Sequence, residues 1–499
     1  MKLVYGRAGS GKSYFCMNEI KECLNENLGR TYIYIVPEQY SLAGEFELSN
    51  MLSKNGTINI QVLSFKRLSY RVFSELGFNK NAFSKASKAM LVYHIMLEES
   101  KNLTLLKGVN KNRGLVDTVT NMISEFKRYN VSCEDLKNIK TQNKYLEMKL
   151  HDLSIIYGKF EKRISENYID TDSRLTVLSN LISKSKMLKE AKIWIDGFDS
   201  FTPQEFSIVS ELDKVADVTV TLTLDKSAEL FSINKKCASK LEKFQNVTII
   251  NLDKIYRFKT KELLHLEENI FKYPPKKYLE DIQKIHVTQE NSPDSEIENV
   301  AKEILNKIQK ENYRYENIAI LTKNIDSYKT LFNRIFKNYN IPYFFDDKKE
   351  LAMQPLLTLV LSLFDIISKN FVYENVFNYL KTGLTNVDDI NDIDILENYV
   401  LQYGIKGNKW FNDFELADPN LEKINLIRKK VIEPILDFKD SFKGKKTAKE
   451  IAIALYQFLV SINVYEKINN TVDSIKNNPN VSSRDLEIAN TYVRVWNIF

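Results

Sequence analysis

The sequence predicts an α/β fold in which a parallel sheet carries a phosphate-binding loop and is interrupted by large helical insertions. Three observations support this prediction. A glycine-rich motif follows the first apolar run, and strand-like runs alternate with helical patterns through the first third of the chain. By contrast, residues 83–166 and 355–499 show helical periodicity almost throughout. Because strands separated by helices are typical of parallel sheets, we expect the strands to run parallel.

The glycine-rich motif has the spacing G-x-x-x-x-G-K-[ST] and directly follows the apolar run 3–5. Backbone N–H groups of such a turn can surround a nucleotide phosphate, since glycines let the chain approach without Cβ clashes. The lysine can reach the β- and γ-phosphates, the serine can bind Mg²⁺, and the following helix points its positive end at the anion. The motif predicts nucleotide binding by Gly6, Arg7, Ala8, Gly9, Ser10, Gly11, Lys12 and Ser13. The alternative is a vestigial loop that holds an anion or nothing.

Short apolar runs and their spacing predict the other elements of the first half. The predicted strands are 31–36, 58–63, 192–196 and 218–224. Helical patterns with apolar residues at i, i+3, i+4 and i+7 occupy 65–76, 116–129 and 145–164. Residues 83–166 therefore form a predicted helical insertion between the strands 58–63 and 192–196.

A charged, linker-like segment from about 253 to 281 separates a second α/β region. Its predicted strands are 284–287 and 318–321, with an extended segment at 341–345, and its predicted helices are 296–309 and 327–337. Beyond residue 355 the pattern is helical, and it reaches Phe499 without a stop signal. We therefore expect the sequence to be an amino-terminal piece of a longer protein.

The composition excludes several classes of protein. With 43% hydrophobic residues, 27% charged residues and no apolar run near 18 residues, the chain is predicted to be soluble, with two to four domains and no membrane segment. Its net charge of +6 is compatible with a local basic groove but too mild to prove nucleic-acid binding. No leader precedes the first strand, which predicts a cytoplasmic protein. The scattered cysteines favour neither disulfides nor a zinc site; they are Cys16, Cys23, Cys133 and Cys237.

A phosphate loop needs an acidic residue on a neighbouring strand to hold the metal of the bound nucleotide. Asp196, at the end of the run Lys-Ile-Trp-Ile-Asp, is the best candidate. An active ATPase of this class carries a glutamate at the next position to polarise the attacking water, but here that position is Gly197. Asp199 is the only carboxylate nearby that could substitute. The sequence therefore favours nucleotide binding without efficient hydrolysis.

Two loops follow strand ends on the side where α/β sheets bind ligands. They are Pro-Glu-Gln-Tyr-Ser at 37–41 and Leu-Ser-Phe-Lys-Arg-Leu-Ser-Tyr-Arg at 63–71. The second loop interleaves aromatic and basic residues, which suits base stacking and phosphate neutralisation on a single strand. The alternative is an ordinary amphipathic helix, with Phe65 and Leu68 in the core and Lys66 and Arg71 solvated. Phe198, past a third strand end, fits either interpretation.

The order of these motifs resembles the AddB family, whose members are subunits of bacterial AddAB helicase–nucleases. The similarity spans about the first 350 residues and rests on the motifs together: the phosphate loop, Pro-Glu-Gln, Val-Leu-Ser-Phe-x-Arg-Leu, Ile-Asp-Gly-Phe and Phe-Thr-Pro-Gln-Glu-Phe. Residues 125–129 and 149–154 add to it, and 318–321 and 341–343 resemble the start of the second motor domain of UvrD-like helicases.

The resemblance implies a superfamily 1 helicase fold built from RecA-like parallel sheets. The implied domains are 1–82 plus 167–255 (first motor domain, 1A), 83–166 (1B-like insertion), 282–370 (incomplete second motor domain, 2A-like) and 371–499 (truncated 2B-like insertion). By position, the residues expected to line the channel for single-stranded DNA and Chi are Gln39, Ser41, Phe65, Arg67, Tyr70 and Phe198.

The resemblance also implies the ligands and partners. ATP and Mg²⁺ are the expected cofactors, with Ser13 and Asp196 on the metal side. AddA is the expected heterodimer partner and supplies the working motor of a helicase/exonuclease that acts on DNA ends in double-strand break repair by homologous recombination. An iron–sulfur cluster belongs to the family's carboxy-terminal nuclease domain, whose motif and cysteines are not matched here.

Two rival functions remain open. A P-loop nucleotide kinase or small ATPase would explain residues 1–40 and leave the rest without a role. A purely architectural subunit would carry the loop as a vestige.

Overall fold

The computed structural model describes residues 1–26, 29–52, 60–78, 81–108, 113–164, 168–226, 228–345, 354–441, 443–444 and 446–498. The chain divides into two compact units, Met1–Gln289 (unit 1) and Glu290–Phe499 (unit 2). Each unit has its own apolar clusters, and each is described by itself below.

Unit 1 is built on a six-stranded sheet with the order β3-β2-β6-β7-β1-β8, in which every pair runs parallel. The strands are β1 (Lys2–Gly6), β2 (Tyr32–Ile35), β3 (Ile60–Leu63), β6 (Lys192–Ile195), β7 (Asp217–Thr223) and β8 (Thr248–Leu252). The predicted parallel α/β sheet is thus confirmed, and β8 is an additional strand that was not predicted.

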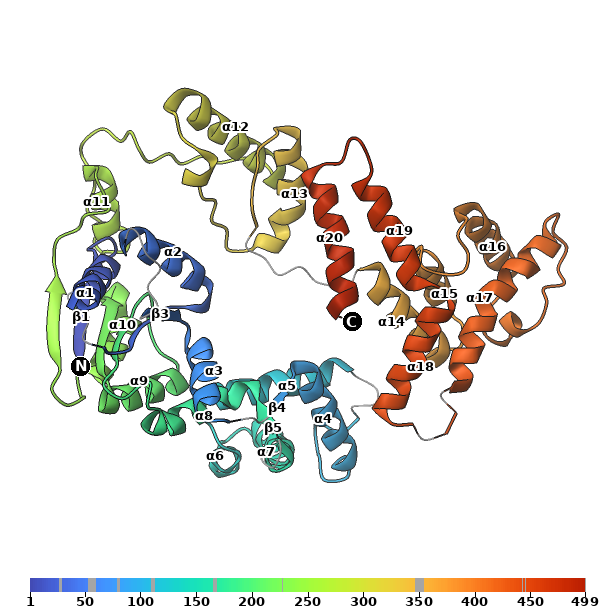
Figure 1. Cartoon of the computed structure of the whole chain (residues 1–499), viewed down its shortest axis with the longest axis horizontal. Helices are drawn as coiled ribbons and strands as arrows, with labels where there is room; N and C mark the ends of the chain where they lie inside the picture. The colour runs from blue at the N-terminus through green and yellow to red at the C-terminus, as the bar shows by residue number, and fades with distance from the viewer. Residues whose placement is uncertain are drawn as a thin grey trace. The chain divides into compact units, whose positions relative to one another are not determined.

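Helices cover both faces of this sheet (Figure 1). Along β2, Tyr32 and Tyr34 join one apolar cluster while Ile33 and Ile35 join another, because successive side chains of a strand point to opposite faces. On the first face lie α1 (Lys12–Glu26) and α2 (Ser41–Leu52). On the second lie α3 (Phe65–Glu75), α8 (Arg174–Leu181), α9 (Pro203–Val215) and α10 (Ser232–Leu241).

The predicted helical insertion is present in unit 1. It consists of α4 (Lys85–Glu98), α5 (Arg113–Arg128), α6 (Cys133–Asn138) and α7 (Lys144–Ile164), around an apolar core of its own. The chain enters through β4 (Asn81–Phe83) and leaves through β5 (Tyr168–Asp170), and these two short strands pair in parallel.

Two polar side chains from the sequence motifs of this insertion serve its structure. Asp152 is fully buried in α7, and its carboxylate accepts hydrogen bonds from the backbone N–H groups of residues 104–106. Lys127, in the motif 125–129, is also buried and forms an ion pair with Asp170 at 2.9 Å. Lys88 of α4 pairs with the same carboxylate at 3.1 Å, which ties the insertion to β5.

The charged segment 253–281, predicted as a linker, contains a helix and contacts the glycine-rich loop. Helix α11 (Lys261–Asn269) lies within it, and Glu262 and Asn269 of that helix are buried. Within this segment Glu267 accepts hydrogen bonds from Arg7 of the site described below, so this part of the predicted linker is attached to unit 1.

Unit 2 begins with two helices, α12 (Pro293–Glu311) and α13 (Ile325–Asn338), as predicted. Three segments of the predicted second α/β region were expected to be strands or extended: 284–287, which lies in unit 1, and 318–321 and 341–345 of unit 2. None of them forms a strand in the described chain. A strand requires backbone hydrogen bonds to a neighbour, and none of these segments pairs with another in the described chain. The rest of the unit is helical as predicted: α14 (Pro355–Ser368), α15 (Tyr373–Leu380), α16 (Ile390–Tyr403), α17 (Leu421–Ser441), α18 (Ala448–Ser461), α19 (Val464–Lys476) and α20 (Ser483–Ile498).

Among the described helices, none is both long and apolar enough to cross a membrane alone. One pair, α18 with α19, reaches that length and composition only when taken together, across a bend of 54°.

Candidate nucleotide-binding site and adjoining strand ends

The glycine-rich loop joins the end of β1 to the start of α1, as the motif predicts. Gly9 and Gly11 have φ angles of 78° and 86°, a backbone region that residues with a Cβ rarely adopt. The Oγ of Ser10 is buried within this loop and has no hydrogen-bond partner among the described residues. A tight turn with its amides at a helix N-terminus and an unsatisfied buried hydroxyl fits an anionic ligand.

Lys12 folds back over the loop that precedes it. Its ammonium group donates to the carbonyl oxygens of Gly6 at 3.0 Å and Arg7 at 2.8 Å. Burial lowers the pKa of Lys12; the nearby Asp196 carboxylate opposes this shift, and the Arg257 guanidinium adds to it. An arriving phosphate would replace the two neutral carbonyls with a full negative charge, which strengthens the hydrogen bonds of the Lys12 ammonium group and favours its charged form.

Asp196 follows β6 and is almost fully buried. Its two carboxylate oxygens accept hydrogen bonds from the hydroxyls of Tyr34, at 2.8 Å, and Thr221. Burial and the charge of Asp196 raise the pKa of Tyr34, which keeps this hydroxyl a donor. Asp196 is therefore held in one orientation beside the loop.

The positions after Asp196 carry no fixed water-activating group. Gly197 has a φ of 80°, and a Cβ built there would lie 3.2 Å from Cδ of Pro37. Asp199 is exposed to solvent. The backbone at Gly197 thus disfavours the glutamate that a hydrolysing site would carry.

Two residues that were not predicted from the sequence lie over the loop. The backbone N–H groups of Tyr256 and Arg257 donate to the carbonyl of Gly9 at 2.8 and 3.3 Å, and the Tyr256 ring passes close to Gly11. The Tyr256 side chain is 61% exposed, and the Nζ of Lys254 lies 5.3 Å from the centroid of its ring. The sequence contained a usable indication: the β-branched run 247–250 predicts the strand β8, and Tyr256 and Arg257 follow shortly after the end of that strand.

The side chain of Arg7 is bound by two acidic residues. Its guanidinium forms ion pairs with Asp225 at 2.8 Å and with Glu267 at 3.1 Å. That all eight motif residues bind the nucleotide stays a prediction, and the guanidinium of Arg7 is engaged by these carboxylates in the structure.

The residues predicted to read single-stranded DNA lie after β2, β3 and β6, which are neighbours in the sheet. Gln39 is exposed, and the hydroxyl of Ser41 donates to the carbonyl of Glu38 at 2.9 Å. Arg67 is half exposed and pairs with Glu45 at 2.9 Å. The hydroxyl of Tyr70 accepts a hydrogen bond from Arg174 at 2.6 Å.

Phe65 and Phe198 belong to one aromatic cluster. Their ring centroids are 5.4 Å apart, and both contact Phe201. Phe65 is only 4% exposed, whereas Phe198 is half-buried. The core position, one of the two alternatives for Phe65, is the one observed, and its role as a stacking residue stays a prediction.

The described residues offer few ligands for a metal of the protein's own. No group of three or more His, Cys, Asp or Glu side chains converges within the described ranges. Ser13 and Asp196 are the oxygen donors that follow β1 and β6, which suits a Mg²⁺ ion carried by a nucleotide. The four cysteines are free thiols.

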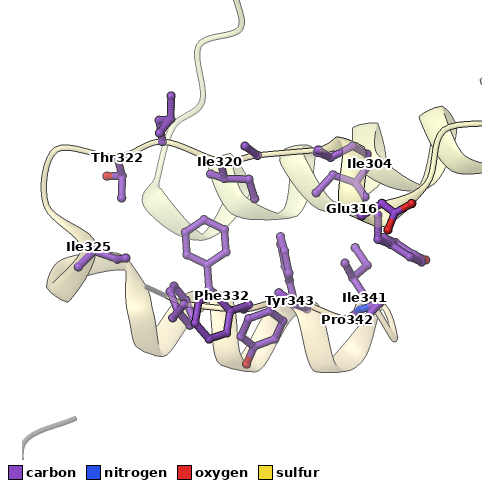
Figure 2. Close-up of a pocket in the computed structure, with 16 residues that line it drawn as sticks. Ile304, Glu316, Ile320, Thr322, Ile325, Phe332, Ile341, Pro342 and Tyr343 are labelled. Carbon is purple, nitrogen blue, oxygen red and sulfur yellow. The ribbon is translucent and has the colours of Figure 1, made fainter. Parts of the chain in front are cut away.

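Unit 2 contains a separate hollow of about 710 Å³. It lies between the extended segments 318–322 and 341–345, and Figure 2 shows Phe332 of α13 directed into it. Its lining is almost entirely apolar, with Glu316 the single charged residue among the lining side chains. Nothing in this lining resembles the phosphate loop of unit 1.

Comparison with known proteins gives one consistent result. The family model described as "ADDB, N-terminal" matches residues 3–267. Similar curated proteins are each named as a subunit of an ATP-dependent helicase/deoxyribonuclease, and the chain aligns with them along its whole length. They include proteins from Clostridium botulinum (strain Loch Maree / Type A3), 38% identical, Clostridium novyi (strain NT), 39% identical, and Clostridium perfringens (strain SM101 / Type A), 36% identical. The chain spans about half the length of these relatives, between 45% and 46%.

Proposed function

Because the chain belongs to the AddB family and matches its N-terminal part, we propose that it is the nucleotide-binding and strand-binding region of one subunit of an ATP-dependent helicase/deoxyribonuclease. The observation that carries the proposal is the loop between β1 and α1. It combines two left-handed glycines, Lys12 and a neighbouring buried carboxylate at Asp196.

In this proposal the phosphates of ATP lie on the loop amides and on Lys12. Mg²⁺ bound to the nucleotide is held on the protein side by Ser13 and Asp196, and it would neutralise the phosphate charge. Arg257 supplies a second cation, since its guanidinium forms no ion pair within the described chain. The exposed ring of Tyr256 offers a face on which the base can stack.

We further propose that this chain hydrolyses ATP slowly and acts with a partner, AddA, that supplies the motor. Gly197 has no side chain to orient water, and Asp199 is exposed to solvent. Nucleotide bound here would then stabilise a conformation of the complex instead of driving translocation.

The strand-binding role is proposed for Gln39, Ser41, Phe65, Arg67, Tyr70 and Phe198. Support comes from their shared position at three adjacent strand ends. To bind DNA, Arg67 must break its ion pair with Glu45 and bind a base or phosphate instead. Phe65 packs against Phe198, and Phe198 is the more exposed of the two rings. In the complete complex these residues would read Chi on the 3′-terminated strand during double-strand break repair.

The domain assignment is likewise a proposal. Residues 1–82 with 167–255 form the first motor-like domain and 83–166 its insertion; 282–370 form an incomplete second motor-like domain and 371–499 a further helical insertion. Of the third, helices α12 and α13 are present, whereas its segments 318–321 and 341–345 do not pair as a sheet in the described chain.

Titration of the 499-residue chain with a fluorescent ATP analogue, followed by labelled single-stranded DNA, tests the proposal. We expect binding of both ligands with little ATP turnover. Phosphoryl transfer to an acceptor would favour a nucleotide kinase instead. Binding of neither ligand would leave an architectural subunit.

A further inference from the structure

The side chain of Arg7 joins three neighbouring parts of the sheet edge. Its Nη1 donates to Asp225, after β7, at 2.8 Å, and its Nε lies 3.2 and 3.1 Å from the two carboxylate oxygens of Glu267 in α11. Its Nη2 donates to the backbone carbonyl of Glu267 at 2.8 Å. Since β7 and β8 flank β1 in the sheet, one guanidinium ties the loop after the central strand to the segments after both neighbours.

The segment after β8 is therefore attached to the phosphate loop at two points. Residues 256–267, called the strap here, begin at the amides bonded to Gly9 and end at the Glu267 carboxylate bonded to Arg7. The contacts of Arg7 are well shielded, because its side chain is 15% and that of Glu267 13% exposed. A forked guanidinium bound to two carboxylates and a carbonyl fixes geometry in a way that a single ammonium group cannot.

We propose that Arg7 is a positioning residue that fastens the strap over the phosphate loop, so that Tyr256 and Arg257 stay above the nucleotide and slow its release. This proposal rests on the proposed nucleotide site. It differs from the expectation for a basic residue inside a phosphate loop, which is direct contact with phosphate.

Removing the negative charge of Glu267 separates the two roles. If Arg7 contacts phosphate, Glu267→Ala frees its guanidinium and removes a nearby anion, so nucleotide should bind more tightly. If Arg7 fastens the strap, the same change should loosen it and speed nucleotide release about tenfold, the loss expected for hydrogen bonds to a charged group. Glu268→Ala is the matched control, since Glu268 is exposed on the same helix.

The release rate of a fluorescent ATP analogue from the full 499-residue chain is the first measurement. We expect faster release from Glu267→Ala and from Arg7→Lys, which keeps the charge and loses the fork, and no change for Glu268→Ala. Tighter binding by Glu267→Ala, or release equal to that of Glu268→Ala, overturns the proposal.

Amide hydrogen exchange without nucleotide is the second measurement. Glu267→Ala should raise exchange at Tyr256 and Arg257, whose amides bond Gly9, while leaving the strands unchanged. Unaltered exchange there overturns the strap. If the unmodified chain binds no analogue, the nucleotide proposal fails, and the exchange result alone decides whether Arg7 fastens the strap.

Discussion

The sheet of unit 1 and the α12–α13 region of unit 2 start from the same sequence pattern and reach different structures. Both alternate apolar runs with amphipathic helices. In unit 1 the runs pair, and Leu3 and Ile33 are fully buried. In unit 2 the runs stay unpaired, and Leu321 and Phe344 are 95% and 89% exposed.

The difference shows that helices and strands depend on different features of the sequence. A helix closes its hydrogen bonds within its own residues, so periodicity alone predicts it. A strand closes them on a neighbour that an apolar run does not specify. The candidate site exists in unit 1 because parallel strand ends converge there, whereas the unpaired segments of unit 2 line an apolar hollow.

The largest effect is expected where buried charges hold unit 1 together. Lys88→Met leaves the buried Asp170 without one of its two cations, and breaking such a pair costs about 3–5 kcal/mol. Urea unfolding of the variant should show this loss in the transition that reports unit 1. Lys85→Met, at an exposed position of the same helix, is the control, and equal stability of the two variants would contradict the role of the buried pair.

A matched pair of truncations tests the comparison directly. Leu3→Ala empties a fully buried position and should cost about 2–5 kcal/mol. Leu321→Ala removes a side chain that is 95% exposed and should change the free energy of unfolding by less than about 0.5 kcal/mol. A large loss for Leu321→Ala would mean that its segment is paired in solution.

Nucleotide binding should depend on unit 1 through Lys12. Lys12→Ala removes the charged donor of the loop and should weaken binding of an ATP analogue about a hundredfold. The measurement is a fluorescence titration beside Lys21→Ala, an exposed lysine of the same helix. Unchanged affinity in Lys12→Ala would remove the nucleotide assignment.

A smaller effect is expected at Gly197. Gly197→Ala places a Cβ on a left-handed residue and should cost about 1–2 kcal/mol. Gly77 also has a positive φ, 64°, but a Cβ there would meet no other atom within 4 Å. The difference in the free energy of unfolding between Gly197→Ala and Gly77→Ala therefore measures the contact with Pro37. Thermal unfolding measures both variants. We also expect no gain in ATP turnover from Gly197→Glu, and a gain would show that the introduced glutamate can activate water. Robust turnover by the unmodified chain that is lost in Asp199→Ala would show instead that Asp199 activates water.

Local signals predicted much of the fold and the centre of the candidate site. The phosphate-loop spacing placed Lys12 and Ser13, and the run before Asp196 placed that carboxylate, because each motif is contiguous in sequence. Tyr256, Arg257 and Glu267 were missed because their contacts join positions about 250 residues apart. Phe65 was ambiguous because an apolar residue at a helix start serves a core and a ligand equally well.

The attachment of the helical insertion defines a transplantable module. Because β4 and β5 pair side by side, the chain leaves the sheet domain and returns to it at the same place. The secondary-structure boundaries alone would cut it at residues 83 and 168. Lys88 binds Asp170 and Asp172, and Lys127 binds Asp170 and Ser173, all of which lie beyond that boundary. A graft between homologous proteins therefore keeps these ion pairs only when it carries residues 81–173 as one piece.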